Sequence, residues 1–450
     1  MRKIDLPIIL DGKPVEKITA FLFHAGGNND PQRLIANQDK SFQGSIVLGM
    51  GFTFDDGNPD ATSIAEMHRL IEKAPRNQER IFSYIGGEEV NSSPTHAHDR
   101  YVINFFDMEE EEARTWSDLM NIVETKVKPE RDVQKRDSIR IRWWQYAEKR
   151  PGLVKAIEPL DRVLVSVQTS KYSTFLVHEV QLTFAKSVFQ QCLCTPYSWK
   201  VLYRTLTFLR KGYVYDQKLV VFSFDTFQPF SILHSRIHEI WSIFFGSSNP
   251  EDRPVYAPTD CFQTFPFPEN WETNRELESI GQEYYEFRAA LMICNNQGLT
   301  ATYNRFHDPE EDDADILKLR QLHTQMDTAV LTAYGWTDIS TTCEFRLDYE
   351  EDTPDTEPFG SAQGKPTEGK RQRKKPWRYR WPEATHDEVL ARLLELNQHR
   401  HEAEILGGKQ AEKKANKSKA KGTKAKKLKG VAVEKQLNLI PPDVEQLDFF

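Results

Sequence analysis

Three charged residues have the types and the spacing of a catalytic metal site. Asp118 is followed by Glu124 and Lys126, and an Asp with a downstream Glu-x-Lys holds the metal ion in many restriction nucleases. In those sites Glu and Lys project to the same side of a strand, because side chains alternate with a period of two. The segment 116–127 has helical periodicity instead, with its apolar residues on one face: Leu119, Ile122, Val123 and Val127. On a helix Glu124 and Lys126 point about 200° apart, at roughly 100° per residue, so the pattern disfavours metal-dependent cleavage.

Histidine and cysteine offer no better metal site. His234 and His238 are one helical turn apart, which suits a zinc pair, but the order is HxxxHE and the sequence shows no third ligand. We therefore expect two interfacial histidines with satisfied hydrogen bonds. The cysteines are odd in number and scattered, which predicts reduced core thiols: Cys192, Cys194, Cys261, Cys294 and Cys343.

Methyl transfer would require two further motifs. A chain that binds S-adenosylmethionine needs a glycine-rich strand-to-helix turn, and adenine chemistry needs an NPPY-like tetrapeptide against the flipped base. The glycines of GMGF (49–52) lie inside a β-like run, and the pair in IGGEEVN (85–91) is typical of a hairpin or bulge. We therefore expect no catalytic residue and no bound cofactor in this chain.

Recognition chemistry is what remains after these exclusions. Arginine donates two bonds to guanine in the major groove, and glutamate accepts from cytosine, so a reading loop combines such residues on a rigid scaffold. The segments 247–262 and 168–173 do so at the ends of predicted strands. The candidate DNA-contacting residues are Glu251, Arg253, Lys171, Ser170, Tyr172 and Arg236. For each of them the alternative, an ordinary solvated loop residue, stays open.

The elements that carry these residues change in type along the chain. From residue 41 to about 268, short runs rich in Val, Ile and Phe are broken by Gly, Asp and Ser, which predicts a mixed, β-rich α/β domain. Helices are predicted within it at 116–127 and 232–245. Two apolar seams with alternating steps of three and four then predict an antiparallel helical hairpin, packed as a simple bundle or as a short coiled coil. The seams are Leu277, Ile280, Tyr284, Phe287, Leu291 and Ile316, Leu319, His323, Met326, Val330.

The last hundred residues read as linker, helix and tail. Residues 341–375 are acidic, then rich in Gly and Pro, then basic, which predicts a flexible linker. An aromatic anchor and one amphipathic helix follow at 376–406. The lysine-rich tail 407–450 is predicted disordered, because it has too few apolar residues to offset the entropy of folding. The last residues of the tail include Gln446, Leu447, Phe449 and Phe450. They resemble the peptide by which bacterial proteins dock on the replication sliding clamp. The alternative, that this apolar end packs on its own domain, stays open.

The charge distribution is compatible with a nucleic-acid partner. The formal net charge of −8 argues against a polyanion as partner, but the charges are segregated. Acidic residues gather at 107–114, 308–315 and 348–358, and basic ones at 126–142, 370–380 and in the tail. Without a bilayer-length apolar run or a signal peptide, we expect a cytoplasmic protein that has no membrane partner.

Many ordered motifs between Ser41 and about Ile405 resemble one family. They include SFQGSIVLGMGFTF, LMNIVETKVKPER, WWQYAEKRPGL, DRVLVSVQTSKY, ILHSRIHEIW, CFQTFPFPE, GLTATYNRFHDP, AYGW and WRYRWPEATHDEVLARLLELN. Together they are similar to the C-terminal region of the large class I DNA methyltransferases of type IIL restriction-modification enzymes and related defence loci. The resemblance implies a target-recognition domain, then helices like the spacers of type I specificity subunits. The family's catalytic domain lies upstream, so the chain resembles a split-gene product or a truncated reading frame.

The resemblance also implies roles for particular residues. In the family a pair of polar residues shortly before a tyrosine and an FP segment takes part in base readout, which here implies Glu251 and Arg253, ahead of Tyr256 and FPFP (265–268). The implied organisation is an N-terminal connector (1–40), a target-recognition domain (41–270), a helical spacer hairpin (271–340), the linker, the anchored helix and the tail.

We therefore expect the DNA sequence-recognition portion of a site-specific DNA adenine methyltransferase of a restriction-modification or phage-defence system. It would bind double-stranded DNA and act with a methyltransferase catalytic subunit that supplies S-adenosylmethionine, without being catalytic alone. Two alternatives stay open. One is a stand-alone metal-dependent nuclease that uses Asp118, Glu124 and Lys126, and the other is a scaffold of a defence complex that does not bind DNA.

Overall fold

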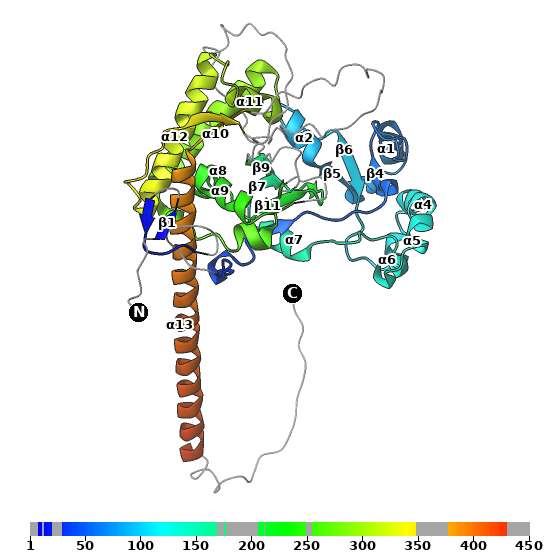
Figure 1. Cartoon of the computed structure of the whole chain (residues 1–450). Helices are drawn as coiled ribbons and strands as arrows, with labels where there is room; N and C mark the ends of the chain where they lie inside the picture. Colours follow the sequence, from blue (N-terminus) through cyan, green and yellow to red (C-terminus); the bar gives the residue numbers. More distant parts are fainter. Residues whose placement is uncertain are drawn as a thin grey trace, which may run out of the picture. The chain divides into compact units, whose positions relative to one another are not determined.

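The computed structural model describes residues 8–10, 13–19, 29–168, 175–176, 206–210, 212–248, 254–347 and 377–429. It confirms the mixed α/β fold (Figure 1). The chain divides into two compact units, Met1–Gln398 and His399–Phe450. Within the described residues no helix is both long and apolar enough to cross a membrane.

A small sheet and several helices form the first core. Its strand order is β10 (Val214–Tyr215), β5 (Ile81–Ile85), β6 (Arg100–Ile103) and β4 (Thr53–Phe54). β10 runs parallel to β5, and the other pairs are antiparallel. Helices α1 (Ile64–Lys73) and α4 (Ser117–Lys126) bury their apolar faces in the same core, so helical periodicity over 116–127 is confirmed.

The second sheet belongs to a larger core. β3 (Ser41–Gln43), β11 (Leu219–Phe222), β7 (Arg162–Val167) and β8 (Phe175–Leu176) follow in that order, and β9 (Thr207–Arg210) also pairs with β7. All of these pairs are antiparallel. Every residue of β11 and all but the first of β7 are buried, because their apolar runs are covered on both faces. Figure 1 labels β7 and β11, and helix α7 (Pro151–Ile157) packs on β3 of the same sheet.

The helix predicted at 232–245 is two helices. α8 (Phe227–His234) and α9 (Arg236–Phe244) are separated by Ser235, whose backbone is extended (φ −68°, ψ 159°). The N–H of Arg236 donates to Oδ1 of Asp327 at 2.9 Å, so a carboxylate distant in sequence caps the start of α9. Periodicity could not predict this break, because it depends on a residue of another helix.

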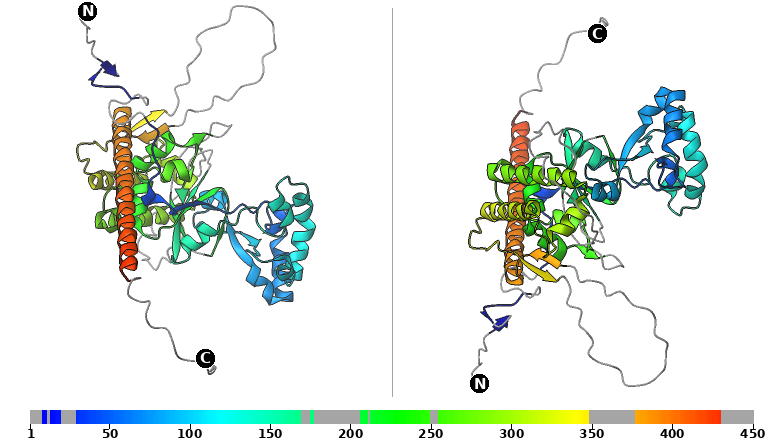
Figure 2. Two further views of the ribbon diagram at one scale, coloured as in Figure 1. Left: turned by 90° about the horizontal axis from the view of Figure 1, so that it is seen from below. Right: turned by 90° about the horizontal axis from the view of Figure 1, so that it is seen from above.

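The predicted helical hairpin is confirmed. α10 (Arg275–Asn295) and α12 (Ala314–Tyr334) pack side by side, with α11 (Leu299–Phe306) between them in sequence (Figure 2). The hydroxyl of Tyr334, at the end of α12, donates to the carbonyl oxygen of Pro266, shortly before α10 begins, so the two helices are antiparallel. Helix α8 also packs on α10. The arrangement is therefore bundle packing rather than an isolated coiled coil.

The flexible linker predicted over 341–375 is wrong at its start, because residues 344–347 form a strand. β14 (Glu344–Leu347) pairs antiparallel with β15 (Trp377–Arg380). Helix α13 (Glu383–Lys429) then buries its apolar face in the larger core through Val389, Leu390, Leu393 and Leu394. Its helical bounds extend beyond the predicted end at about 406, into the lysine-rich segment, because Ala and Lys have high helix propensity.

The remaining elements are short. The strands are β1 (Ile8–Leu10), β2 (Lys13–Val15), β12 (Ser247–Ser248) and β13 (Pro254–Val255). The helices are η1 (Ile35–Asn37), η2 (Met50–Phe52), η3 (Pro75–Arg80), α2 (Gly87–Ser92), α3 (Glu110–Ala113), α5 (Lys128–Asp132), α6 (Asp137–Ile141), η4 (Pro258–Phe262) and η5 (Trp271–Thr273).

Candidate nucleic-acid interface

The two candidate reading segments leave the larger core at one point. β7 ends at Val167, and Gln168 opens the segment 168–173. The backbone N–H of Tyr256, in the segment 247–262, donates to the carbonyl oxygen of Gln168 at 2.9 Å. Residues almost ninety positions apart in sequence are thereby joined at the end of one buried strand.

Tyr256 fixes the base of the second segment. Its side chain is 1% exposed, its hydroxyl is 3.0 Å from Nε2 of His238, and its ring lies edge-on to Phe222. Directly before it, β12 and β13 pair as a hairpin, with Ser248 opposite Pro254. The connection 249–253 therefore starts from a base that is anchored in the core.

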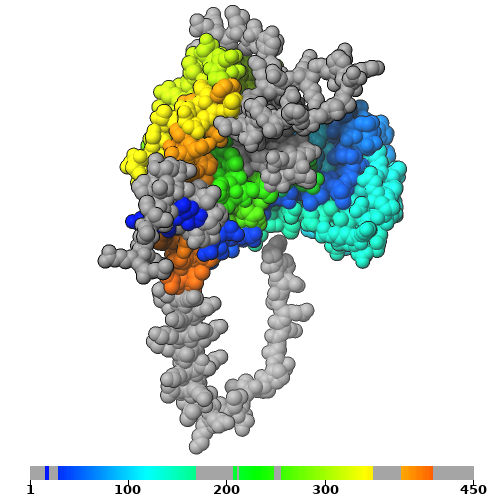
Figure 3. Space-filling view, in the orientation of Figure 1, coloured from blue at the N-terminus to red at the C-terminus, as the bar shows by residue number. Residues whose placement is uncertain are grey.

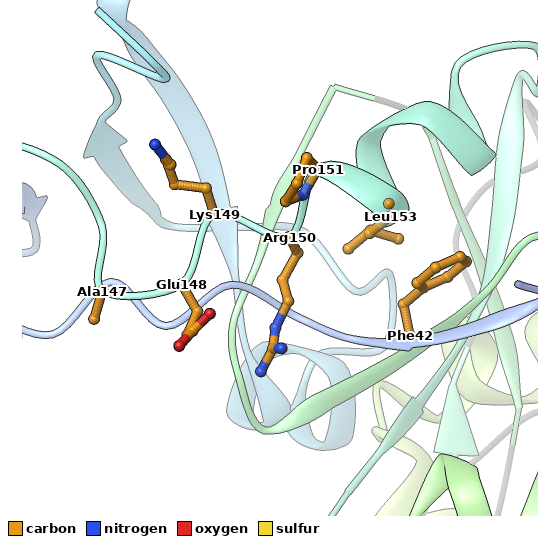
Figure 4. A pocket seen from close by; sticks show the side chains of 8 residues that line it. Phe42, Ala147, Glu148, Lys149, Arg150, Pro151 and Leu153 are labelled. Atoms are coloured by element: carbon orange, nitrogen blue, oxygen red, sulfur yellow. The ribbon is translucent and has the colours of Figure 1, made fainter. Parts of the chain in front are cut away.

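A polar network holds the end of β7 from the other side. The side-chain amide of Gln43 donates to Oε1 of Gln168 at 2.9 Å and to the carbonyl oxygen of Gln217 at 3.0 Å. Arg150 in turn donates to Oε1 of Gln43 at 2.9 Å, and Figure 4 shows its side chain extending toward the segment that carries Phe42. Because the Gln43 amide group and Oε1 of Gln168 have defined partners, the network fixes the orientation of both side chains.

The hollow in Figure 4 has a volume of about 360 Å³ and lies between Phe42 and the segment 147–153. A larger cavity of about 980 Å³ lies beside Tyr84, Arg100 and the turn 216–218. Five carboxylates and two cationic side chains line it: Asp55, Glu88, Glu89, Asp99, Asp216, Arg100 and Lys218. This excess of negative charge disfavours entry of a phosphate group.

Pairing inside the larger cavity fixes its walls. The hydroxyl of Tyr84 donates to Asp216, and Arg100 pairs with Glu89. Burial, together with the charge of Asp216, raises the pKa of Tyr84, so this phenol stays protonated. Burial also lowers the pKa of His98, which keeps its ring neutral near pH 7.

Most predicted DNA-contacting residues lie outside the described residues. These are Glu251, Arg253, Lys171, Ser170 and Tyr172, and their roles stay predictions. The same holds for the terminal peptide with Gln446, Leu447, Phe449 and Phe450. The structure describes the strands and anchors on either side of the reading segments instead.

Arg236 is the exception, and its position contradicts our prediction of a DNA contact. Its side chain is buried, and Nη1 lies 2.6 Å from Oδ2 of Asp327 and 2.7 Å from Nδ1 of His323. Burial alone would raise the pKa of Asp327, but His323 and Arg236 hold it below its usual range. Arginine is usually exposed, and the sequence places Arg236 beside an apolar helical face. The sequence could not show that a carboxylate 91 positions away would pair with Arg236.

The three residues of the nuclease pattern lie in separate interactions. Asp118 pairs with Lys73 at 2.6 Å, and Glu124 pairs with both Arg114 and Lys128 at 3.0 Å. The ammonium of Lys126 donates to the carbonyl oxygen of residue 61 at 2.7 Å. Hydrogen bonds from Arg114 and Lys128 lower the pKa of Glu124 to about 2. The part of the chain that the structure describes contains no group of His, Cys, Asp and Glu arranged to hold a metal ion.

The histidine prediction is confirmed. Nε2 of His234 is 2.9 Å from the hydroxyl of Tyr303, and His238 contacts Tyr256. Burial lowers the pKa of His234 well below its ordinary value, so the ring is neutral. The cysteines at 261, 294 and 343 form no disulfide among the described residues.

One glycine motif differs from its prediction. Residues 50–52 of GMGF form a 3-10 turn, and the glycine pair of IGGEEVN opens α2 rather than a hairpin. Oε2 of Glu89 accepts the N–H of Gly86 at 3.0 Å, which caps this helix. At six residues α2 is too short to be the long helix that follows a cofactor loop.

Comparison with known proteins adds one finding. No family model and no curated protein matches the sequence. Among solved structures, the fold is similar to that of the type IIL restriction-modification enzyme MmeI, which was determined in complex with DNA. The TM-score is 0.53 at 15% identity, over 87% of this chain and 39% of MmeI. The chain therefore shares the fold of part of that enzyme and spans about two fifths of its length.

Sequence reasoning missed the residues that brace the reading segments. Gln43, Gln217 and Lys218 come from β3 and from the turn between β10 and β11. The sequence YDQKL between two short β-like runs was a local signal for a turn. Its contact with Gln168 was visible only in three dimensions.

Proposed function

We propose that this chain is the DNA sequence-recognition portion of a site-specific adenine methyltransferase from a restriction-modification or phage-defence system. The observation that carries the proposal is the hydrogen bond from the Tyr256 N–H to the Gln168 carbonyl oxygen. It joins the described bases of two segments whose sequences are rich in base-reading and phosphate-binding residues, at the end of the buried strand β7. Glu251 and Arg253 would read base edges, and Lys171, Ser170 and Tyr172 would contact the backbone or bases beside them.

Rigidity is the physical reason why this arrangement suits recognition. A reading side chain discriminates between bases only when its scaffold holds it in register with the groove, so that a wrong base leaves a hydrogen bond unmade. The buried Tyr256 and the amide network around Gln168 provide such a scaffold. The similarity in fold to part of a restriction-modification enzyme that was solved with DNA supports the same proposal.

The proposal assigns the methyl transfer to another polypeptide or domain. A methyltransferase catalytic subunit would bind S-adenosylmethionine and the extruded adenine, while this chain selects the site. We place this assembly in the cytoplasm. The terminal peptide that contains Gln446 and Phe450 would add a contact to the replication sliding clamp.

Binding of the full chain to DNA tests the proposal. Fluorescence anisotropy with a random-sequence duplex should show an association constant that falls steeply as salt rises from about 50 to about 200 mM, because phosphate contacts release counterions. Selection from that pool, by the chain alone and with a candidate methyltransferase catalytic subunit, should enrich one base string. If the chain with its methylase binds no duplex at any salt, a scaffold that does not bind DNA is the better assignment.

A further inference from the structure

The turn between β10 and β11 is held firmly against both sheets. The N–H of Asp216 donates to the carbonyl oxygen of Ile85 at 2.9 Å, which ties the turn to the smaller sheet. The side-chain carboxylate of Asp216 accepts the N–H of Lys218 at 2.8 Å, and the backbone carbonyl oxygen of Asp216 accepts the N–H of Leu219 at 2.9 Å. The turn therefore presents its side chains from a fixed backbone.

Gly44 permits this close approach. A Cβ at this position would collide with the carbonyl oxygens of Tyr215 and Asp216, so only glycine fits beside the turn. The N–H of Ser45 donates to the carbonyl oxygen of Tyr215 at 2.8 Å, which completes the contact. In Figure 3 a blue surface of N-terminal residues directly adjoins the green surface.

The same turn adjoins the base of both reading segments. The N–H of Gln168 donates to the carbonyl oxygen of Lys218 at 2.6 Å, while the carbonyl oxygen of Gln168 accepts from Tyr256. One residue thus links the turn, the segment 168–173 and the hairpin that precedes Tyr256. The turn therefore lies beside the described base of each reading segment.

Two side chains of the turn are available to a ligand. Lys218 is exposed and Gln217 is half-buried, and within the described part of the chain neither side chain forms a hydrogen bond or an ion pair. Nearby cations differ in this respect. Arg150 donates to Gln43, and Lys149 pairs with Asp107.

We infer that the turn Asp216 to Lys218 is a third DNA-contacting element, in addition to the two reading segments. The ammonium of Lys218 would bind a backbone phosphate, and the amide of Gln217 would pair with the N6 and N7 edge of an adenine. This inference rests on the proposed function. Lys218 is exposed but also lines the carboxylate-rich cavity, so the phosphate would bind on the solvent side of its ammonium, because the carboxylates repel a polyanion.

The phosphate contact is tested with Lys218→Ala in the full chain, against the same fluorescein-labelled random-sequence duplex. We expect affinity to fall about tenfold and the slope of log K against log salt to decrease by about 0.9, as for the loss of one phosphate contact. Lys318→Ala is the matched control, since this half-buried lysine of α12 pairs with Glu283 at 4.0 Å and its loss removes the same charge. Equal affinities and slopes for Lys218→Ala and wild type would overturn the phosphate contact.

The base contact is tested with Gln217→Ala in selection from the same duplex pool, with the methylase present. We expect enrichment of adenine at one position to drop by at least about fivefold, while other positions stay unchanged. An unaltered base preference would overturn the readout role. A wild-type chain that binds no duplex even with the methylase would sink the proposed function itself, whereas a binding wild type with two unaffected variants would sink only this inference. Thermal melting by circular dichroism verifies that each variant is folded.

Discussion

Replacing Asp327 by asparagine tests whether one buried ion pair holds helix α9 against the helical hairpin. Asp327 is fully buried, Arg236 is 3% exposed, and their charged atoms lie 2.6 Å apart. Asparagine keeps the shape of the side chain and an oxygen that can accept the N–H of Arg236. It removes the counter-charge and leaves a guanidinium in the core.

The expected loss follows from that uncompensated charge. Removing one partner of a buried pair costs about 3 to 5 kcal/mol of unfolding free energy. Typical total stabilities are about 5 to 15 kcal/mol, so the variant should lose a large share. Asp327→Ala also removes the cap of α9, which adds about 1 kcal/mol to the loss.

Urea denaturation of the full chain, followed by circular dichroism, measures these differences. Asp338→Asn is the matched control, because Asp338 pairs with Arg392 on the surface, where solvent screens the interaction, and a much smaller change is expected. The double variant Arg236→Met with Asp327→Leu should regain most of the stability, since it buries no charge. If Asp327→Asn stayed within about 1 kcal/mol of wild type, the ion pair would not hold these helices together.

Further predictions concern pH, specificity, cleavage and the tail. The free energy of unfolding should fall as the pH drops below 6.5. Burial lowers the pKa of His234, His307 and His323, so the folded chain favours their neutral rings, and urea midpoints at several pH values measure the loss. Arg253→Ala should relax one position of the recognised site and cost about 1 to 3 kcal/mol of discrimination, and an unchanged selected sequence would contradict this. Plasmid DNA incubated with the full chain and magnesium should stay intact. Cleavage that is lost in the Glu124→Ala variant would favour the alternative function of a metal-dependent nuclease. Deleting residues 446–450 should abolish retention on immobilised sliding clamp, and equal retention would remove that role.

Local pattern in the sequence was enough for the helices and for the separation of Glu124 from Lys126. The seams of α10 and α12 repeat with the period of a helix, and the structure buries them except for Ile280 and Phe287, which are partly buried. The same periodicity over 116–127 placed Glu124 and Lys126 apart, and they interact with different partners. These properties depend on neighbours within a few residues along the chain, so a linear reading captures them.

Tertiary structure alone decided the residues whose partners are distant in sequence. Arg236 looked available to DNA until α12 brought Asp327 to it. Ser235 interrupts a continuous helical pattern because the same carboxylate caps α9. Likewise, Gln168, Lys218 and Tyr256 come from separate segments and meet through backbone hydrogen bonds. Backbone bonds do not depend on side-chain type, so no residue pattern could have revealed that junction.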